Sequence, residues 1–170
     1  MSMNTRPNSA ADCINFLVSR FQSLSHLEVG EKKLHALLYL ALREGYAIFR
    51  RSIFEGTFVY LPEGPFCVEL DAMNMTQRRL FHGECEITHT AKLILTSILE
   101  QYGTLDLPTL VSRIEDDLAW TKAKSWSSDS CNGILDPKLI EVDSQKVNIL
   151  KSLWCMDHST LLESPSPHIA

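Results

Sequence analysis

Residues 31–49 carry an apolar pattern that covers more than one side of a helix, and this constrains the fold more than any other feature of the sequence. Leucine and alanine recur at helical spacing along a wide stripe formed by Leu34, Leu37, Leu38, Ala41 and Leu42. Tyr39 and Leu40 extend the stripe around the helix. A helix that is apolar on most sides is normally surrounded by other elements. The sequence therefore predicts a domain built around a central helix.

Further amphipathic segments predict helices that pack around this centre. Ser9 and Asp12 form a capping pattern ahead of an apolar face at residues 14–21. The clearest helical pattern runs from Ile87 to Tyr102, and Gly103 is a typical stop signal.

The second half of the chain predicts three shorter helices. One starts at Asp106, and another starts at Asp116–Asp117 and carries Trp120. A last helix is expected over residues 143–154, with one face formed by Val147, Leu150 and Trp154.

Two β-rich stretches between the central helix and residue 71 predict a small hairpin. Residues 52–54 and 57–60 flank Glu55-Gly56, which predicts a hairpin with its turn at that dipeptide. The loop LPEGP that follows is expected to be stiff, because Pro65 fixes its own φ and restricts Gly64. A short helix is expected after Pro65, through residues 68–71.

The predicted fold class is predominantly α-helical (α+β): a compact bundle of about five to seven helices around a central apolar helix, with a small β-hairpin. The chain has 170 residues, which fits one domain. We expect residues 1–158 to form that domain and residues 159–170 to form a flexible tail.

Composition restricts the classes of partner. The net charge of −5 argues against a nonspecific grip on nucleic acid, which needs clustered positive charge. No apolar run approaches the length needed to cross a bilayer, and the N-terminus lacks the apolar core of a signal peptide, so we expect a cytoplasmic protein without a membrane partner. The five cysteines are odd in number and widely spread, which is typical of free thiols.

Residues that carry catalytic or metal chemistry form no strong motif. His82, Cys85 and His89 make the one His/Cys/Glu cluster, a weak candidate for Zn²⁺ against the alternative of a polar loop entering a helix. Cys67 is the least implausible nucleophile, and the acidic run at residues 115–117 is more typical of helix capping and a solvated surface. We therefore expect no enzyme, no metal and no cofactor. A satisfied core or boundary histidine is the expected role of His35.

The order of motifs resembles the Panacea family of SocA- and GepA-like domains. The stretch KLHALLYLALREGYAIF resembles the family's L-x-K-L-L-Y-Y-A-x helix, and TFVYLPEGPFCVEL resembles its extended aromatic segment with a Gly-Pro turn. YGTLDLPTLVSRI is similar to the family's Y-G-x-L-x-x-x-x-L segment, and DLAWTKAK carries its W-x-x-A element. The resemblance covers about residues 30–124.

The departures from the family pattern indicate a divergent member. His35 or Ala36 stands in place of the family's lysine in the central helix, and LPE precedes the Gly-Pro turn. The family's Thr-His and Pro-Trp elements are missing, with Ala119 before Trp120.

The resemblance implies a protein that works by binding. Panacea-domain proteins are antitoxin-like, many neutralise a toxin by direct contact, and SocA-like members act as adaptors that deliver a toxin to a protease. We therefore expect a protein partner, either a cognate toxin or a host protein, with a protease involved if the chain is adaptor-like. The alternative is a phage or mobile-element inhibitor of a host defence or host enzyme complex. The residues predicted to bind the partner are Phe58, Tyr60, Gly64, Pro65, Phe66 and Trp120.

Overall fold

The computed structural model describes residues 8–73, 86–127 and 133–162, with side chains of the last helix described as far as residue 157. Within these residues it contains eight α-helices and a two-stranded antiparallel sheet, which confirms the predominantly helical α+β prediction. The elements are α1 Ala10–Ser25, α2 Glu31–Phe49, β1 Phe58–Leu61, β2 Gly64–Cys67, α3 Val68–Ala72, α5 His89–Tyr102, α6 Leu107–Ser112, α7 Leu118–Trp126, α8 Pro137–Asp143, the short 3₁₀ helix η1 Ser144–Lys146, and α9 Ile149–Leu162.

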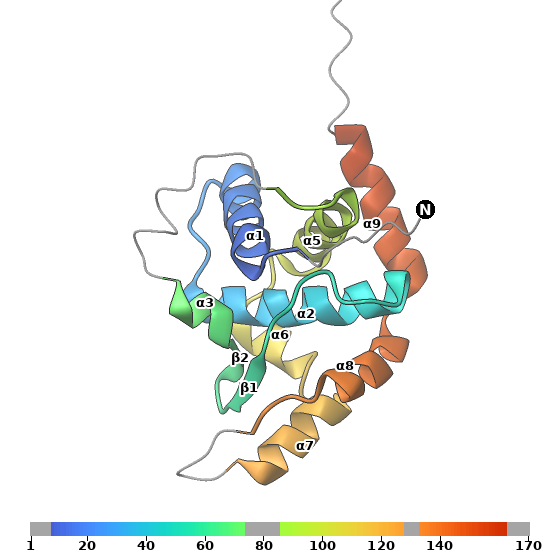
Figure 1. Cartoon of the computed structure of the whole chain (residues 1–170). Helices are drawn as coiled ribbons and strands as arrows, with labels where there is room; N and C mark the ends of the chain where they lie inside the picture. Colours follow the sequence, from blue (N-terminus) through green and yellow to red (C-terminus); the bar gives the residue numbers. More distant parts are fainter. Residues whose placement is uncertain (1–7, 74–85, 128–132, 163–170) are drawn as a thin grey trace, which may run out of the picture.

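Helix α2 lies at the centre of the molecule, as its sequence predicts. Every residue from Leu34 to Gly45 is buried, including the polar His35, Arg43 and Glu44. In Figure 1, α1, α5 and α9 lie above α2, and the hairpin, α6, α7 and α8 lie below it. Burying one leucine side chain contributes about 1.5–3 kcal/mol, so this helix supplies a large share of the core.

Side-chain caps form at the start of α5 and α6, and the cap at Asp106 was predicted from the sequence. The side chain of Thr88 accepts a hydrogen bond from the Ala91 N–H at the start of α5, and Asp106 accepts one from the Thr109 N–H at the start of α6. Ser9 occupies the N-cap position of α1, but within the described residues its side chain makes no capping hydrogen bond.

The predicted hairpin is wrong in its position. The strands are residues 58–61 and 64–67, and the turn is Pro62–Glu63 rather than Glu55-Gly56. Phe54 is instead packed into the core beside Phe58, and its backbone bridges to Asn8. Gly56 lies against the Phe54 ring, where a Cβ would come within 2.5 Å of the ring carbons. The LPEGP loop is therefore the hairpin turn itself.

The last helix is also shifted from its prediction. Residues 137–143 form α8, which was not predicted, and α9 begins at Ile149 and continues to Leu162, past the expected start of a tail at residue 159. The face predicted from Leu150 and Trp154 points to solvent, while Ser152 and Met156 face the core. The reason is a buried polar contact: Ser152 lies against Ser97 and Gln101 of α5.

Candidate functional site

The hairpin is held against the central helix in one register. Phe58 faces Cys67, Val59 faces Phe66, and Leu61 faces Gly64 across the turn. Gly64 has φ +142°, a conformation that side chains rarely adopt, and a Cβ there would lie 3.2 Å from Val111. The glycine of LPEGP is therefore required by the turn.

Both edges of the hairpin are occupied. Strand β1 pairs on its second edge with residues 133–135, through bonds from the Tyr60 N–H to the Gly133 carbonyl (2.8 Å) and from the Leu135 N–H to the Phe58 carbonyl (2.9 Å). On β2, the Cys67 N–H donates to Nδ1 of His35 on α2 (2.9 Å). Pro65 has no N–H to donate, which suits an edge strand. The hairpin is therefore fixed to α2 and protected from adding another strand.

His35 joins the hairpin to α2 a second time through its ring. It stacks on Phe66 with ring centroids 4.7 Å apart and an interplanar angle of 20°. His35 is buried, whereas Phe66 is half-buried. Because Nδ1 accepts the Cys67 N–H, this nitrogen carries no proton in the structure. The prediction that His35 is a satisfied core histidine is confirmed.

A cleft of about 270 Å³ opens beside this stacked pair. It lies between the start of α2 and the hairpin turn and is lined by Glu31, Lys32, His35, Leu61, Glu63, Gly64, Pro65 and Phe66. Its charged residues Glu31, Lys32 and Glu63 are exposed, and its walls are largely apolar. The volume falls just below the range of about 300–1,000 Å³ typical of small-molecule sites.

Two of the six predicted partner-binding residues, Phe58 and Trp120, belong to the core. Phe58 packs edge-on against Tyr39, with centroids 5.7 Å apart, and Trp120 is buried under Tyr60 at 4.6 Å. Gly64 and Pro65 have little exposed surface, but both line the cleft. A buried side chain is not available to a partner, so Phe58 and Trp120 are corrected to core positions. Tyr60 and Phe66 keep partly exposed rings, and of these two Phe66 lines the cleft.

Of the residues considered as metal ligands or nucleophiles, Cys67 and His89 are described by the structure and do not line this cleft. His82 and Cys85 lie outside the described residues, and His89 is the first residue of α5. In the described parts of the chain, no group of three or more His, Cys, Asp or Glu side chains is placed to hold a metal ion. Burial raises the pKa of the Cys67 thiol to about 12, so it stays protonated and is a poor nucleophile at neutral pH.

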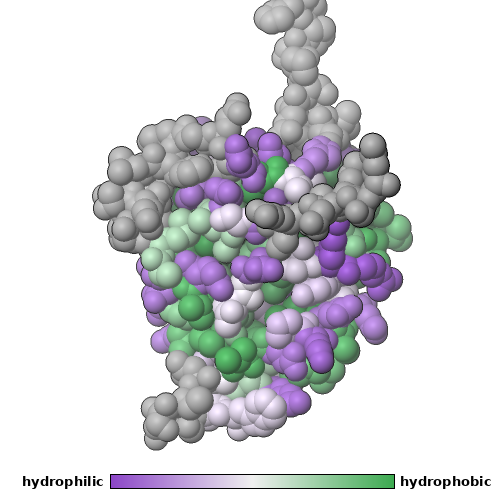
Figure 2. All heavy atoms as spheres, in the orientation of Figure 1, coloured by the Kyte–Doolittle hydropathy of each residue, from purple (hydrophilic) through white to green (hydrophobic). Residues whose placement is uncertain are grey.

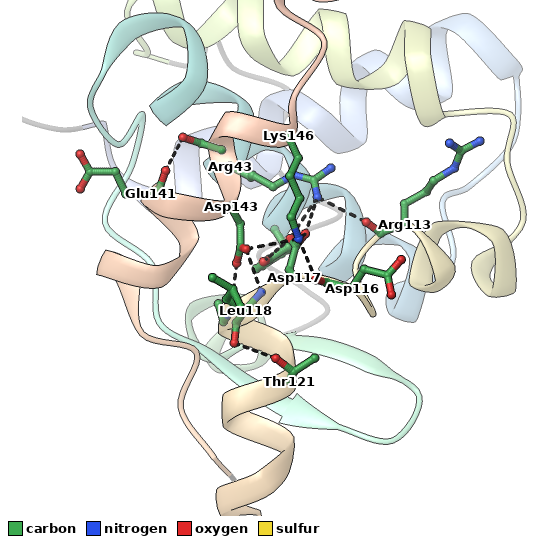
Figure 3. A network of polar contacts seen from close by, with 12 residues as sticks. Arg43, Arg113, Asp116, Asp117, Leu118, Thr121, Glu141, Asp143 and Lys146 are labelled. Atoms are coloured by element: carbon green, nitrogen blue, oxygen red, sulfur yellow. Dashed lines mark hydrogen bonds and ion pairs between the residues drawn. The ribbon is translucent and has the colours of Figure 1, made fainter.

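The acidic run contains a buried residue that sequence reasoning missed. Glu115 and Asp116 are exposed as expected, but Asp117 is buried. Its carboxylate accepts bonds from Nη1 of Arg43, at 3.0 Å to each oxygen (Figure 3). It also accepts a bond from the Tyr39 hydroxyl at 2.8 Å. Arg43 and Tyr39 are four residues apart on α2, and that spacing is the signal that they share a face.

A second buried carboxylate completes this network. Asp143, at the end of α8, accepts bonds from the backbone N–H groups of Leu118 (2.8 Å) and Ala119 (2.9 Å) and so caps α7. Lys146 lies 3.6 Å from both Asp117 and Asp143. Desolvation by burial raises the pKa of Asp117, against the opposing effect of Arg43. The network ties α2, α7, α8 and η1 together, which indicates a structural role.

A third buried carboxylate fastens α9. Glu44 of α2 accepts bonds from the Ser97 hydroxyl (3.1 Å) and the Gln101 amide (2.9 Å) of α5, and Gln101 also bonds the Ser152 hydroxyl (3.3 Å) of α9. Burial raises the pKa of Glu44, and the hydrogen bonds from Ser152, Ser97 and Gln101 oppose the rise.

Comparison of the chain with protein-family models, with curated proteins and with solved structures gave no match. Within the described residues, no helix is both long and apolar enough to cross a membrane.

Proposed function

We propose that this chain is an antitoxin-like protein-binding module, which neutralises a partner protein by direct contact at the cleft beside Phe66 and performs no catalysis. The observation that carries the proposal is the Phe66 ring, which is half-buried at the wall of an open cleft and stacked on the buried His35. Aromatic anchors and the pockets around them contribute most of the energy in many protein interfaces.

The rigidity of the cleft supports a binding role. Its walls are fixed by the Cys67–His35 hydrogen bond on β2 and by the pairing of β1 with residues 133–135. A surface that is already ordered loses little conformational entropy on binding, and this raises affinity for a given set of contacts. The cleft therefore suits a partner that inserts one side chain and rests on the surrounding rim.

The resemblance to the Panacea family supports the proposal from the sequence side. The two stretches that resemble the family's central helix and its Gly-Pro segment are residues 33–49 and 57–70. In this fold these stretches meet, and residues from both line the cleft. His35 comes from the first stretch, and the second contributes Leu61, Glu63, Gly64, Pro65 and Phe66.

The test is capture of the partner by wild-type protein and by variants of the cleft. Phe66→Asp places a charge on the half-exposed ring position without opening the core. We expect it to lose a stoichiometric partner that the wild type captures from lysate of the native host. Val68→Asp is the matched control, because Val68 is 43% exposed, lies two residues away and does not line the cleft.

The effect of the captured partner on growth then distinguishes a toxin from a host protein. Expressed alone, a toxin should arrest growth, and co-expression of the wild type, but not of Phe66→Asp, should restore growth. A partner that is harmless alone and belongs to a host defence or enzyme complex would favour the inhibitor alternative. Equal capture by the wild type, Phe66→Asp and Val68→Asp would refute the cleft as the binding site.

A further inference from the structure

Helix α9 presents an apolar face to solvent that the core does not use. Leu150 is 80% exposed and Trp154 is 62% exposed, and the neighbouring Ile149 and Leu153 are exposed as well. These four residues recur one turn apart along one side of the helix. Figure 2 shows hydrophobic side chains gathered at the right-hand edge of the molecule, where α9 lies in Figure 1.

Contacts on the opposite side of α9 explain why its apolar face is exposed to solvent. Ser152, Cys155 and Met156 are buried toward the rest of the protein, and Ser152 takes part in the polar contacts with Ser97 and Gln101. Those contacts fix the rotation of the helix about its axis. Leu150 and Trp154 are therefore held outward by the packing of their neighbours.

The size of the face is sufficient for a stable contact. Its four apolar side chains expose on the order of 400 Å², within the range of the largest patches on monomeric proteins, which are often functional. Two such faces buried against each other remove about 800 Å² of apolar surface from solvent. Interfaces also bury polar surface, and an interface with this much apolar area has a total area of about 1,300 Å². One copy of α9 against another therefore reaches the size of a specific interface.

We propose that α9 is the interface of a homodimer, in which two copies of the helix pack antiparallel about a two-fold axis between residues 151 and 152. That register sets Leu150 opposite the partner's Leu153, and Ile149 opposite the partner's Trp154. Every apolar residue of the face then meets an apolar residue, as a two-fold contact requires of one self-complementary surface.

Charge selects the antiparallel arrangement over the parallel one. Asp157 is exposed and follows Leu153 by four residues, so it lies on the same face. A parallel pairing sets the two copies of Asp157 directly opposite each other, where like charges repel. The antiparallel pairing places them at the two far ends of the contact.

Sedimentation equilibrium of the full chain tests the dimer independently of any partner protein. We expect the wild type to reach twice the 19.2 kDa of one chain with rising concentration, and Leu150→Asp to stay at 19.2 kDa. Leu27→Asp is the matched control, because Leu27 is 67% exposed and lies between α1 and α2. Circular dichroism and thermal melting establish that each variant is folded.

Disulfide cross-linking tests the register without altering the core. A mixture of Leu150→Cys and Leu153→Cys chains, oxidised with diamide, should form the mixed cross-link at least tenfold faster than either variant alone, with the wild type as the background for native thiols. A wild type that is monomeric at every concentration would overturn the proposal. So would a dimer that Leu150→Asp leaves intact, one that Leu27→Asp disrupts equally, or the absence of preferential mixed cross-linking.

Discussion

Replacing Asp117 with alanine should remove a large part of the stability of this protein. The carboxylate is buried and bonds Nη1 of Arg43 at 3.0 Å and the Tyr39 hydroxyl at 2.8 Å. Its removal leaves the Arg43 guanidinium buried without its carboxylate and Tyr39 without this acceptor. Breaking a buried ion pair by removing one member costs about 3–5 kcal/mol.

The expected loss is large relative to the total. A domain of this kind has a free energy of unfolding of about 5–15 kcal/mol, so a loss of about 4 kcal/mol removes a quarter or more of it. With a urea m-value of about 2 kcal/mol/M, the unfolding midpoint falls by about 2 M. The assay is urea unfolding followed by circular dichroism.

Two further variants separate the ion pair from other effects. Asp116→Ala changes the exposed neighbour, and its effect should stay within about 0.5 kcal/mol. The double variant Arg43→Met/Asp117→Ala removes both charges, so it should lose less stability than the sum of the two single variants, by about 2 kcal/mol. Additive losses, or an Asp117→Ala loss no larger than that of Asp116→Ala, would refute the reasoning.

Three other predictions follow from buried groups and from the turn. Because burial raises the pKa of Glu44, the native state holds the carboxyl proton of Glu44 more tightly than the unfolded state, so stability should fall as the pH rises from the ordinary carboxyl range through the raised pKa. Glu44→Gln should flatten this part of the pH dependence. A pH profile of urea midpoints that the substitution leaves unchanged would contradict the prediction. Gly64→Ala should cost about 1–3 kcal/mol because alanine is strained at φ +142°, and an unchanged melting temperature would argue against that strain. Cys67, with a pKa of about 12, should react with iodoacetamide near pH 8 much more slowly in the native protein than in urea, as peptide mass spectrometry measures; equal rates would disprove its burial.

The parts of the fold that were predicted correctly are those that depend on residues close to one another in the sequence. The central helix was predicted with its observed bounds, because its apolar residues recur around the whole cylinder between Glu31 and Phe49. The caps at Asp106 and the stop at Gly103 also depend on neighbouring residues alone. The LPEGP segment was predicted as a loop, and it forms the turn between β1 and β2.

The parts that sequence missed depend on contacts between distant residues. Residues 52–54 and 64–67 both look suitable to pair with β1, and the choice is made by Gly64 at the turn and by the bond from Cys67 to His35. Helical periodicity likewise gives α9 two candidate faces, and the buried Ser152 selects the one that packs inward. The spacing of apolar residues along one helix does not show which polar residues of another helix it will contact.

The same limit applies to the candidate site. Aromatic residues near LPEGP were predicted to bind a partner, but sequence does not show that Phe58 and Trp120 have their rings under Tyr39 and Tyr60. The stacking of Phe66 on His35 joins residues from two separate elements, and the cleft beside it exists only in the folded chain.

Hydrogen–deuterium exchange of the chain with and without its captured partner tests the central claim most directly. The account predicts that partner binding slows exchange at residues 31–35 and 61–67, the two segments that contain the residues lining the cleft, and that Phe66→Asp abolishes this protection. Protection confined to other segments, with residues 31–35 and 61–67 unchanged, would contradict the proposal that the cleft is where this protein binds.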